Sequence, residues 1–191
     1  SSLLRQCDMQ PVLLDRLEDN LEATCASLRE AAGQVDVLIS SGGVSVGEED
    51  HVRDALQRIG ELHMWRIAVK PGKPLAVGII GNTPFFGLPG NPVSGFITYL
   101  MLVLPFLKLS AGQNANPPQP FMLPAAFDHS GGGRTEFLRA RVEQGKVHIY
   151  ANQGSGVLTS VQWAQGLVRQ EANRPISAGD LVPYWTLESL M

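Results

Sequence analysis

The sequence predicts an α/β domain with a mostly parallel sheet flanked by helices, followed by a small all-β, barrel-like domain. Strand-like and helix-like segments alternate over residues 1–111, which is typical of a parallel sheet covered by helices. Residues 112–120 are polar and contain three prolines, which is typical of a linker. Residues 121–191 then have the short alternating runs of a β domain. We therefore expect two domains, 1–111 and 121–191.

In the first domain, four segments have the apolar or β-branched character of strands: 9–14, 35–40, 62–69 and 75–80. Three segments place apolar residues at helical spacing: 21–32, 52–59 and 92–109. Asp19 or Asn20 is the expected cap of the first helix, and Gly60 ends the second. Pro92 opens the third helix at a favourable first-turn position.

In the second domain, four short runs are strand-like: 135–142, 146–150, 167–171 and 181–185. Gln144-Gly145 separates the first two runs and predicts a hairpin. A small domain of such strands is expected to curl into a barrel.

The start of the chain is too short for a complete parallel sheet. Six residues, Ser1 to Gln6, precede the apolar run that begins at Cys7, whereas a helix that joins parallel strands needs about a dozen residues. The first strand of the α/β domain is also missing. We therefore expect that residues are omitted before Ser1 and near Gln6.

Composition excludes several function classes. The formal net charge of -3 argues against a general nucleic-acid-binding protein, because phosphate contacts need clustered lysine and arginine. The two cysteines, Cys7 and Cys25, lack metal-site spacing and fit a reducing cytosol. The most apolar run, 96–107, is shorter than the roughly 20 residues of a membrane span and is expected to form a buried helix. We therefore expect a cytoplasmic protein without nucleic-acid or membrane partners.

The first of three glycine- and proline-rich loops covers residues 40–50, between a predicted strand and a predicted helix. Gly42 and Gly43 allow backbone N–H groups to approach a phosphate closely, and Ser41 and Ser45 add hydroxyl groups. The glycine spacing differs from that of a nucleotide P-loop and of a dinucleotide-binding loop.

Three carboxylates follow in the same loop: Glu48, Glu49 and Asp50. They can stabilise the start of the next helix through capping and its dipole. They can also ligate Mg²⁺, which prefers one or two carboxylates together with substrate oxygens. Spacing alone leaves both roles open.

The second loop carries Lys70 and Lys73 between prolines, with Arg66 four residues upstream. Prolines fix the chain, and this set of cations suits an oxyanion or a phosphate. A solvated turn with scattered charges is the alternative. Because Arg66 and Lys70 are four residues apart, strand alternation predicts that they share one face.

The third loop covers residues 87–94 and leads into the long apolar helix. Free N–H groups at the start of that helix can bind an anion, although a tight turn with proline at the first helical position is an equal alternative. In α/β folds, ligands bind beyond the carboxyl ends of the strands. Three such loops on one sheet therefore predict a phosphorylated or anionic ligand.

The loops resemble, in order and spacing, those of the MoeA family and the E domain of gephyrin. The matching segments are SGGVSVG (41–47) followed by Glu48 and Asp50, KPGKP (70–74), GLPGNPVS (87–94), FLRAR (137–141) and QGSG (153–156). The resemblance covers essentially the whole chain and corresponds to the C-terminal half of the family's proteins, which are about twice as long.

The resemblance implies a molybdopterin molybdotransferase of molybdenum cofactor biosynthesis. Such an enzyme inserts molybdate into adenylylated molybdopterin and releases AMP, with Mg²⁺ or a related divalent ion. It also implies a molybdopterin-binding α/β domain, a terminal β-barrel, and a homodimer whose active site forms between subunits. This chain alone could therefore lack activity.

By motif match, Asp50 would be the key carboxylate near the metal and pyrophosphate, and Lys70 a family basic residue. Arg66 stands where many relatives are expected to have lysine. The implied metal ligands are Asp50, Glu48 and Asp19. The implied pterin-nucleotide contacts are Ser41, Gly42, Gly43, Ser45, Gly47, Lys73, Pro89, Gly90, Asn91, Pro92, Ser94 and Ser155, with Arg139 as a further contact from the β domain.

Two alternative functions remain open. A gephyrin-like scaffold could use the same fold to bind a peptide from a membrane receptor. A molybdopterin adenylyltransferase is related, but its loop would carry a GGTG-type pattern in place of Gly42-Gly43-Val44-Ser45, and it would not need the β domain.

Overall fold

A computed structural model describes residues 4–5, 8–42, 51–113 and 116–191. Its contacts divide the chain into two compact units. Unit 1 consists of Ser1–Ile67 and Pro74–Gly90, and unit 2 consists of Ala68–Lys73 and Asn91–Met191. Each unit has its own β-sheet, so each is described by itself.

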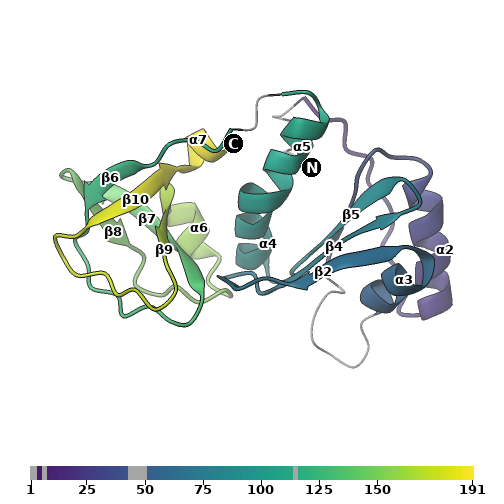
Figure 1. Ribbon diagram of the computed structural model, residues 1–191, viewed down its shortest axis with the longest axis horizontal. Helices are drawn as coiled ribbons and strands as arrows, with labels where there is room; N and C mark the ends of the chain where they lie inside the picture. The colour runs from purple at the N-terminus through teal and green to yellow at the C-terminus, as the bar shows by residue number, and fades with distance from the viewer. Residues whose placement is uncertain (1–3, 6–7, 43–50, 114–115) are drawn as a thin grey trace. The chain divides into compact units, whose positions relative to one another are not determined.

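Unit 1 contains a four-stranded mixed sheet (Figure 1). In sheet order, its strands are β1 (Leu38–Ser41), β5 (Thr83–Leu88), β4 (Pro74–Ile80) and β2 (Glu61–Arg66). β1 and β5 are parallel, whereas β5 and β4, and β4 and β2, are antiparallel. The prediction of a mostly parallel sheet is therefore wrong for the described residues.

The difference arises from a hairpin that the sequence-based prediction left out. Gly81 and Asn82 form a two-residue turn between β4 and β5, and such a turn joins antiparallel strands. Gly81 has a φ of 61°, which glycine adopts without strain. The strand predicted at 9–14 is also wrong: no described strand pairs with these residues, and Leu13 is 79% exposed.

Two helices confirm the predictions for unit 1 and lie on the same side of its sheet: α2 (Leu21–Ala32) and α3 (His51–Ile59) (Figure 1). Asn20 caps α2, because its Oδ1 accepts hydrogen bonds from the backbone N–H groups of Glu22 and Ala23. Helix and strand side chains share one buried core that includes Cys25, Leu28, Ala55, Leu56, Ala76 and Phe85. This core holds the sheet whose strand ends carry the predicted loops.

A continuous helical segment opens the main part of unit 2. It consists of α4 (Pro92–Thr98), the π-helical turn η1 (Tyr99–Val103) and α5 (Leu104–Ser110). Pro105 lacks an N–H group, and the wider turn just before it relieves the clash that a proline causes inside an α-helix. The predicted long apolar helix is confirmed, with this local change of pitch.

The same helical segment is long and apolar enough, by length and composition, to cross a membrane. Pro92–Ser110 spans 19 residues with a mean hydropathy of 1.7, so it exceeds the twelve-residue run noted in the sequence. Half of it is buried inside the protein. Val93 and Ile97 pack with Phe137, Leu167 and Leu190 in the core of unit 2.

The sheet of unit 2 follows the order β3–β7–β9–β10–β6, with β8 paired to the other part of β7. Its strands are β3 (Val69–Lys70), β6 (Phe121–Pro124), β7 (Thr135–Glu143), β8 (Lys146–Ile149), β9 (Gly166–Gln170) and β10 (Leu181–Thr186). Two short helices, α6 (Thr159–Trp163) and α7 (Leu187–Leu190), accompany it. The hairpin predicted at Gln144-Gly145 is confirmed between β7 and β8. A closed barrel is not confirmed, since the strand path of the described residues is open.

Arg139 places a positively charged side chain in the interior of unit 2. Arg139, on β7, is 1% exposed; its Nε donates to Ser160 Oγ at 3.1 Å and its Nη2 to the Gly154 carbonyl at 3.1 Å. Desolvation lowers the pKa of Arg139 to about 10, and the negative charge of Glu136 opposes that change. The guanidinium therefore stays charged at neutral pH and holds the turn that contains Gly154 and Ser155.

Replacing this arginine should loosen the turn. Lysine keeps the charge of Arg139 but lacks the planar fork that reaches Ser160 and Gly154 together. We expect Arg139→Lys to lower the free energy of unfolding by about 2–3 kcal/mol, measured by urea denaturation, because charge-assisted hydrogen bonds are lost in a buried site. Arg169→Lys is the matched control, since Arg169 is 47% exposed and should change stability by less than about 0.5 kcal/mol. Equal urea midpoints for the two variants would contradict this role of Arg139.

Candidate functional site

All three predicted loops begin at one edge of the unit 1 sheet. β1 and β5 run parallel with Ser41 paired to Leu88, so the first and third loops leave neighbouring strands at the same edge. β4 begins at that edge because Ala76 pairs with Gly87, and β2 ends there because Arg66 pairs with Pro74. The second loop, which joins β2 to β4, therefore has both of its ends at this edge.

The first and third loops touch through their glycines. The Gly42 N–H donates a hydrogen bond of 3.0 Å to the Leu88 carbonyl, and Gly42 has a φ of 88°. A Cβ atom at Gly90 would lie 3.4 Å from the Gly42 Cα, at the limit of a tolerable contact. Glycine at both positions therefore lets two backbone turns approach each other, while the predicted approach of Gly42 to a phosphate stays a prediction.

The charge at this edge comes from Arg66. It is the last residue of β2, its side chain is exposed, and it forms no ion pair with a described residue. An exposed guanidinium at this edge suits an anionic ligand. Ser41, the last residue of β1, is also exposed, whereas Pro89 is buried and shapes the third loop.

The start of α4 shows that three predicted contacts have structural roles. The Asn91 side chain accepts a hydrogen bond from the Val93 N–H at 3.2 Å and caps the helix, with Pro92 in the first turn. Ser94 is 5% exposed and is part of the helix interior. The alternative of proline at the start of the helix is thus confirmed for Pro92, the cap at Asn91 was not predicted, and Gly90 is exposed.

The body of the second loop belongs to unit 2. Lys70 lies on β3, which pairs with β7, and its Nζ lies 3.1 Å from Glu136 Oε2 and 3.2 Å from Oε1. Gly72 has a φ of 117° and packs against Thr98 of α4, so a side chain there would collide. Lys73 is exposed.

The prediction that Arg66 and Lys70 share one face of a strand is wrong. It assumed one strand over 62–69, but β2 ends at Arg66 and β3 begins at Val69 in the other sheet. Because the two residues belong to different strands and different units, strand alternation does not relate them. The meeting of all three loop bodies in one cradle stays a prediction.

The acidic residues are only partly described. Gly43, Ser45, Gly47, Glu48 and Asp50 lie outside the described residues. Asp19 is exposed, and its Oδ1 lies 3.5 Å from Nε2 of His51, the residue that follows Asp50 in the sequence. Among the described residues, no three His, Cys, Asp or Glu side chains cluster as metal ligands.

In unit 2, Ser155 is exposed on the turn that Arg139 holds. Arg139 itself is buried, so it supports the turn and does not present its guanidinium to solvent. Glu136 and His129, whose Nε2 lies 3.2 Å from Glu136 Oε2, were absent from the sequence-based site. The available signal was a single acidic residue in the otherwise apolar start of a predicted strand.

Comparison with known proteins identifies the two halves of the chain. Residues 1–109 match the family described as probable molybdopterin binding domain, and residues 123–187 match the MoeA C-terminal region (domain IV). Over 188 residues the chain is 35% identical to the molybdopterin molybdenumtransferase of Haemophilus influenzae, covering 94% of this chain and 46% of that protein. It is 36% identical over 178 residues to the molybdenum cofactor synthesis protein cinnamon of Drosophila melanogaster, covering 87% of this chain and 30% of that protein.

The fold agrees with these matches. The crystal structure of the molybdopterin biosynthesis MoeA protein from Pyrococcus horikosii superposes with a TM-score of 0.73 and 28% sequence identity, covering 88% of this chain and 41% of that one. The chain thus spans less than half the length of these relatives. The chain therefore belongs to the family described as probable molybdopterin binding domain, and it carries a C-terminal segment that matches the MoeA C-terminal region (domain IV).

Proposed function

We propose that the protein inserts molybdate into adenylylated molybdopterin with release of AMP, as a molybdopterin molybdotransferase. One observation carries the proposal. One edge of one sheet carries the glycine turns at Gly42 and Gly90 and the exposed Arg66. Both ends of the second loop, called the lysine loop from here on because it carries Lys70 and Lys73, lie at the same edge. This is the strand-end position at which α/β folds bind anionic ligands. The family match to a probable molybdopterin binding domain supports a pterin ligand, and we propose that this ligand is the adenylylated form.

The residues act mainly through electrostatics. Backbone N–H groups of the glycine turns, apart from the Gly42 N–H that bonds to the Leu88 carbonyl, bind the phosphates of the pterin nucleotide together with the hydroxyl groups of Ser41 and Ser45. Arg66, Lys70 and Lys73 offset the charges of pyrophosphate and molybdate, so that two anions can approach each other. Ser155, Asn91 and Ser94 line or support the pterin site. No protein nucleophile is required, because the pterin sulfurs supply the ligands to molybdenum and the protein positions the reactants.

Carboxylates fit a hard divalent cation at the first loop. Asp50, Glu48 and Asp19 would hold Mg²⁺, since the pairing of Asp19 with His51 places one carboxylate beside the residue that follows Asp50. When bound, the ion would neutralise pyrophosphate oxygens. Gly43, Gly47, Pro89, Gly90 and Pro92 would shape the loops around that charge.

We also propose the domain organisation that the family implies. The modules are residues 1–111 and 121–191 joined by the linker 112–120, and the β module is barrel-like. A bridge between Ala125 and Val147 supports this curvature, because it links the β6 and β8 ends of the open sheet. The protein is proposed to act in the cytoplasm as a homodimer, without nucleic-acid or membrane partners.

Asp50 gives the sharpest test of the metal site. In the full-length protein, we expect Asp50→Ala to lower the rate of molybdate insertion by about a hundredfold or more, because charge stabilisation at a phosphate site is lost. The measurement is release of AMP at increasing Mg²⁺, with the urea midpoint as the check on folding. Asp54→Ala is the matched control, since Asp54 is exposed in the first turn of α3. Normal insertion by Asp50→Ala would remove this residue from the mechanism.

Arg66 tests the charge at the sheet edge. We expect Arg66→Ala to raise the KM for the pterin nucleotide by about tenfold or more, the equivalent of one charge-assisted hydrogen bond, and to weaken the dependence of KM on ionic strength. Arg66→Lys should recover part of the loss, because it keeps the charge without the planar fork. Arg29→Ala removes an exposed charge from the last turn of α2 and should leave KM unchanged. Equal KM values for the two alanine variants would place the anion elsewhere.

A further inference from the structure

The carboxylate of Glu136 is buried in unit 2 and is surrounded by nitrogen groups. Its side chain is 5% exposed, and Lys70 Nζ lies 3.1 Å from Oε2 and 3.2 Å from Oε1. His129 Nε2 lies 3.2 Å from Oε2, and the carboxylate also attracts the buried Arg139 guanidinium. A buried carboxylate is costly unless such partners compensate it, so this arrangement needs a reason beyond packing.

The surrounding backbone fixes the carboxylate. Gly132 lies so close that a Cβ atom there would be 3.4 Å from Glu136 Oε1. Val69 and Lys70 pair in parallel with Thr135 and Glu136, and the Thr135 N–H donates to the Ala68 carbonyl at 3.1 Å. Strand and side chain together therefore fasten the start of the lysine loop to β7.

The geometry points to Glu136 as a positioning residue for Lys70. An ammonium group has three donors, and the two Glu136 oxygens occupy one side of it. The Lys70 side chain is still 44% exposed, so it keeps donor capacity toward solvent or an anion. A lysine fixed in this way binds an oxyanion with less loss of side-chain freedom than a mobile one. This inference rests on the proposed function, in which Lys70 contacts the charged substrate.

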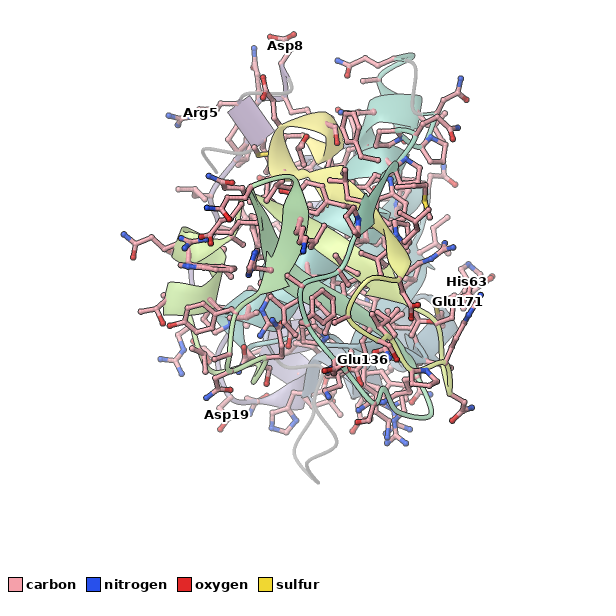
Figure 2. All side chains as sticks on the ribbon, turned by 90° about the vertical axis from the view of Figure 1, so that its left-hand side faces the viewer. Arg5, Asp8, Asp19, His63, Glu136 and Glu171 are labelled. Carbon is pink, nitrogen blue, oxygen red and sulfur yellow. The ribbon has the colours of Figure 1, made fainter. Side chains whose placement is uncertain are left out.

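Strand β7, which carries Glu136, also supports Ser155, the other predicted substrate contact in unit 2. Three residues after Glu136, Arg139 holds the Gly154 carbonyl and thereby the turn that carries Ser155. Glu136 lies inside the fold, whereas Glu171 of the same unit projects at the edge of the view (Figure 2). Glu171 pairs with Arg174 and is 55% exposed, which makes it the matched control for a loss of one carboxylate.

The test is a double-mutant cycle in the full-length protein, read as kcat and KM for molybdate insertion. Its variants are Glu136→Gln, Lys70→Ala, their combination, Glu136→Asp and Glu171→Gln. We expect Glu136→Gln to lower kcat/KM by about tenfold, Glu136→Asp to recover part of it, and Glu171→Gln to have no effect. In the Lys70→Ala background, Glu136→Gln should cost no more than about twofold, because its partner is already gone.

Absence of molybdate insertion by the wild-type full-length protein would overturn the proposed function itself, whereas two other results would overturn only this inference. Normal insertion by Lys70→Ala alone would remove Lys70 from the proposed mechanism and Glu136 with it. A different result would overturn the positioning role of Glu136 and leave the proposed function standing. In that result Lys70→Ala lowers kcat/KM, and adding Glu136→Gln to it lowers kcat/KM again by the full factor seen in the wild-type background. If Glu136→Gln does not fold, the test is the rate at which the Lys70 ammonium protons exchange with water in the wild-type protein, measured by NMR. Exchange with water slower than for Lys73 supports the inference, and equal exchange overturns it.

Discussion

Parallel pairing of β1 with β5 is the constraint on which the site depends. The register sets Ser41 beside Leu88 and thereby places the first and third loops next to each other. The pairing of β4 with β5 and of β2 with β4 then brings both ends of the second loop to the same edge. The α2–α3 core holds the sheet from one side and leaves the strand ends free. Because the glycine turns of the first and third loops are in backbone contact, the backbone itself fixes the relative position of these two loops at the sheet edge.

Strand β7 has a comparable organising role in unit 2. It contributes Glu136 toward the lysine loop and Arg139 toward the turn at Gly154. Two opposite buried charges three residues apart compensate each other in part, which is reflected in the opposing effect of Glu136 on the Arg139 pKa. One strand thus orders two segments that the sequence places far apart.

Sequence reasoning reached the helices, the strands at 35–40 and 75–80, and the three loops, because apolar periodicity and glycine-proline motifs are local signals. It missed β5, since Thr83–Leu88 reads as part of a loop, and with it the antiparallel hairpin. It joined β2 and β3 into one strand because the break at Ile67-Ala68 depends on pairing with β7, a tertiary event. Glu136 was missed for the same reason: only the fold brings it to Lys70.

All but the last residue of the helix Pro92–Ser110 lies within the first family match, yet the buried face of this helix belongs to the second compact unit. Val93 and Ile97 share one core with Phe137 and Leu167, although the proline-rich segment 112–120 separates the two pairs in the sequence. If evolution exchanged the C-terminal module between relatives at residues 112–120, the new module would have to reproduce that apolar surface. Recombination there is therefore constrained by shape complementarity, and a swap that changed the bulk of either partner would leave a cavity or a clash in the core.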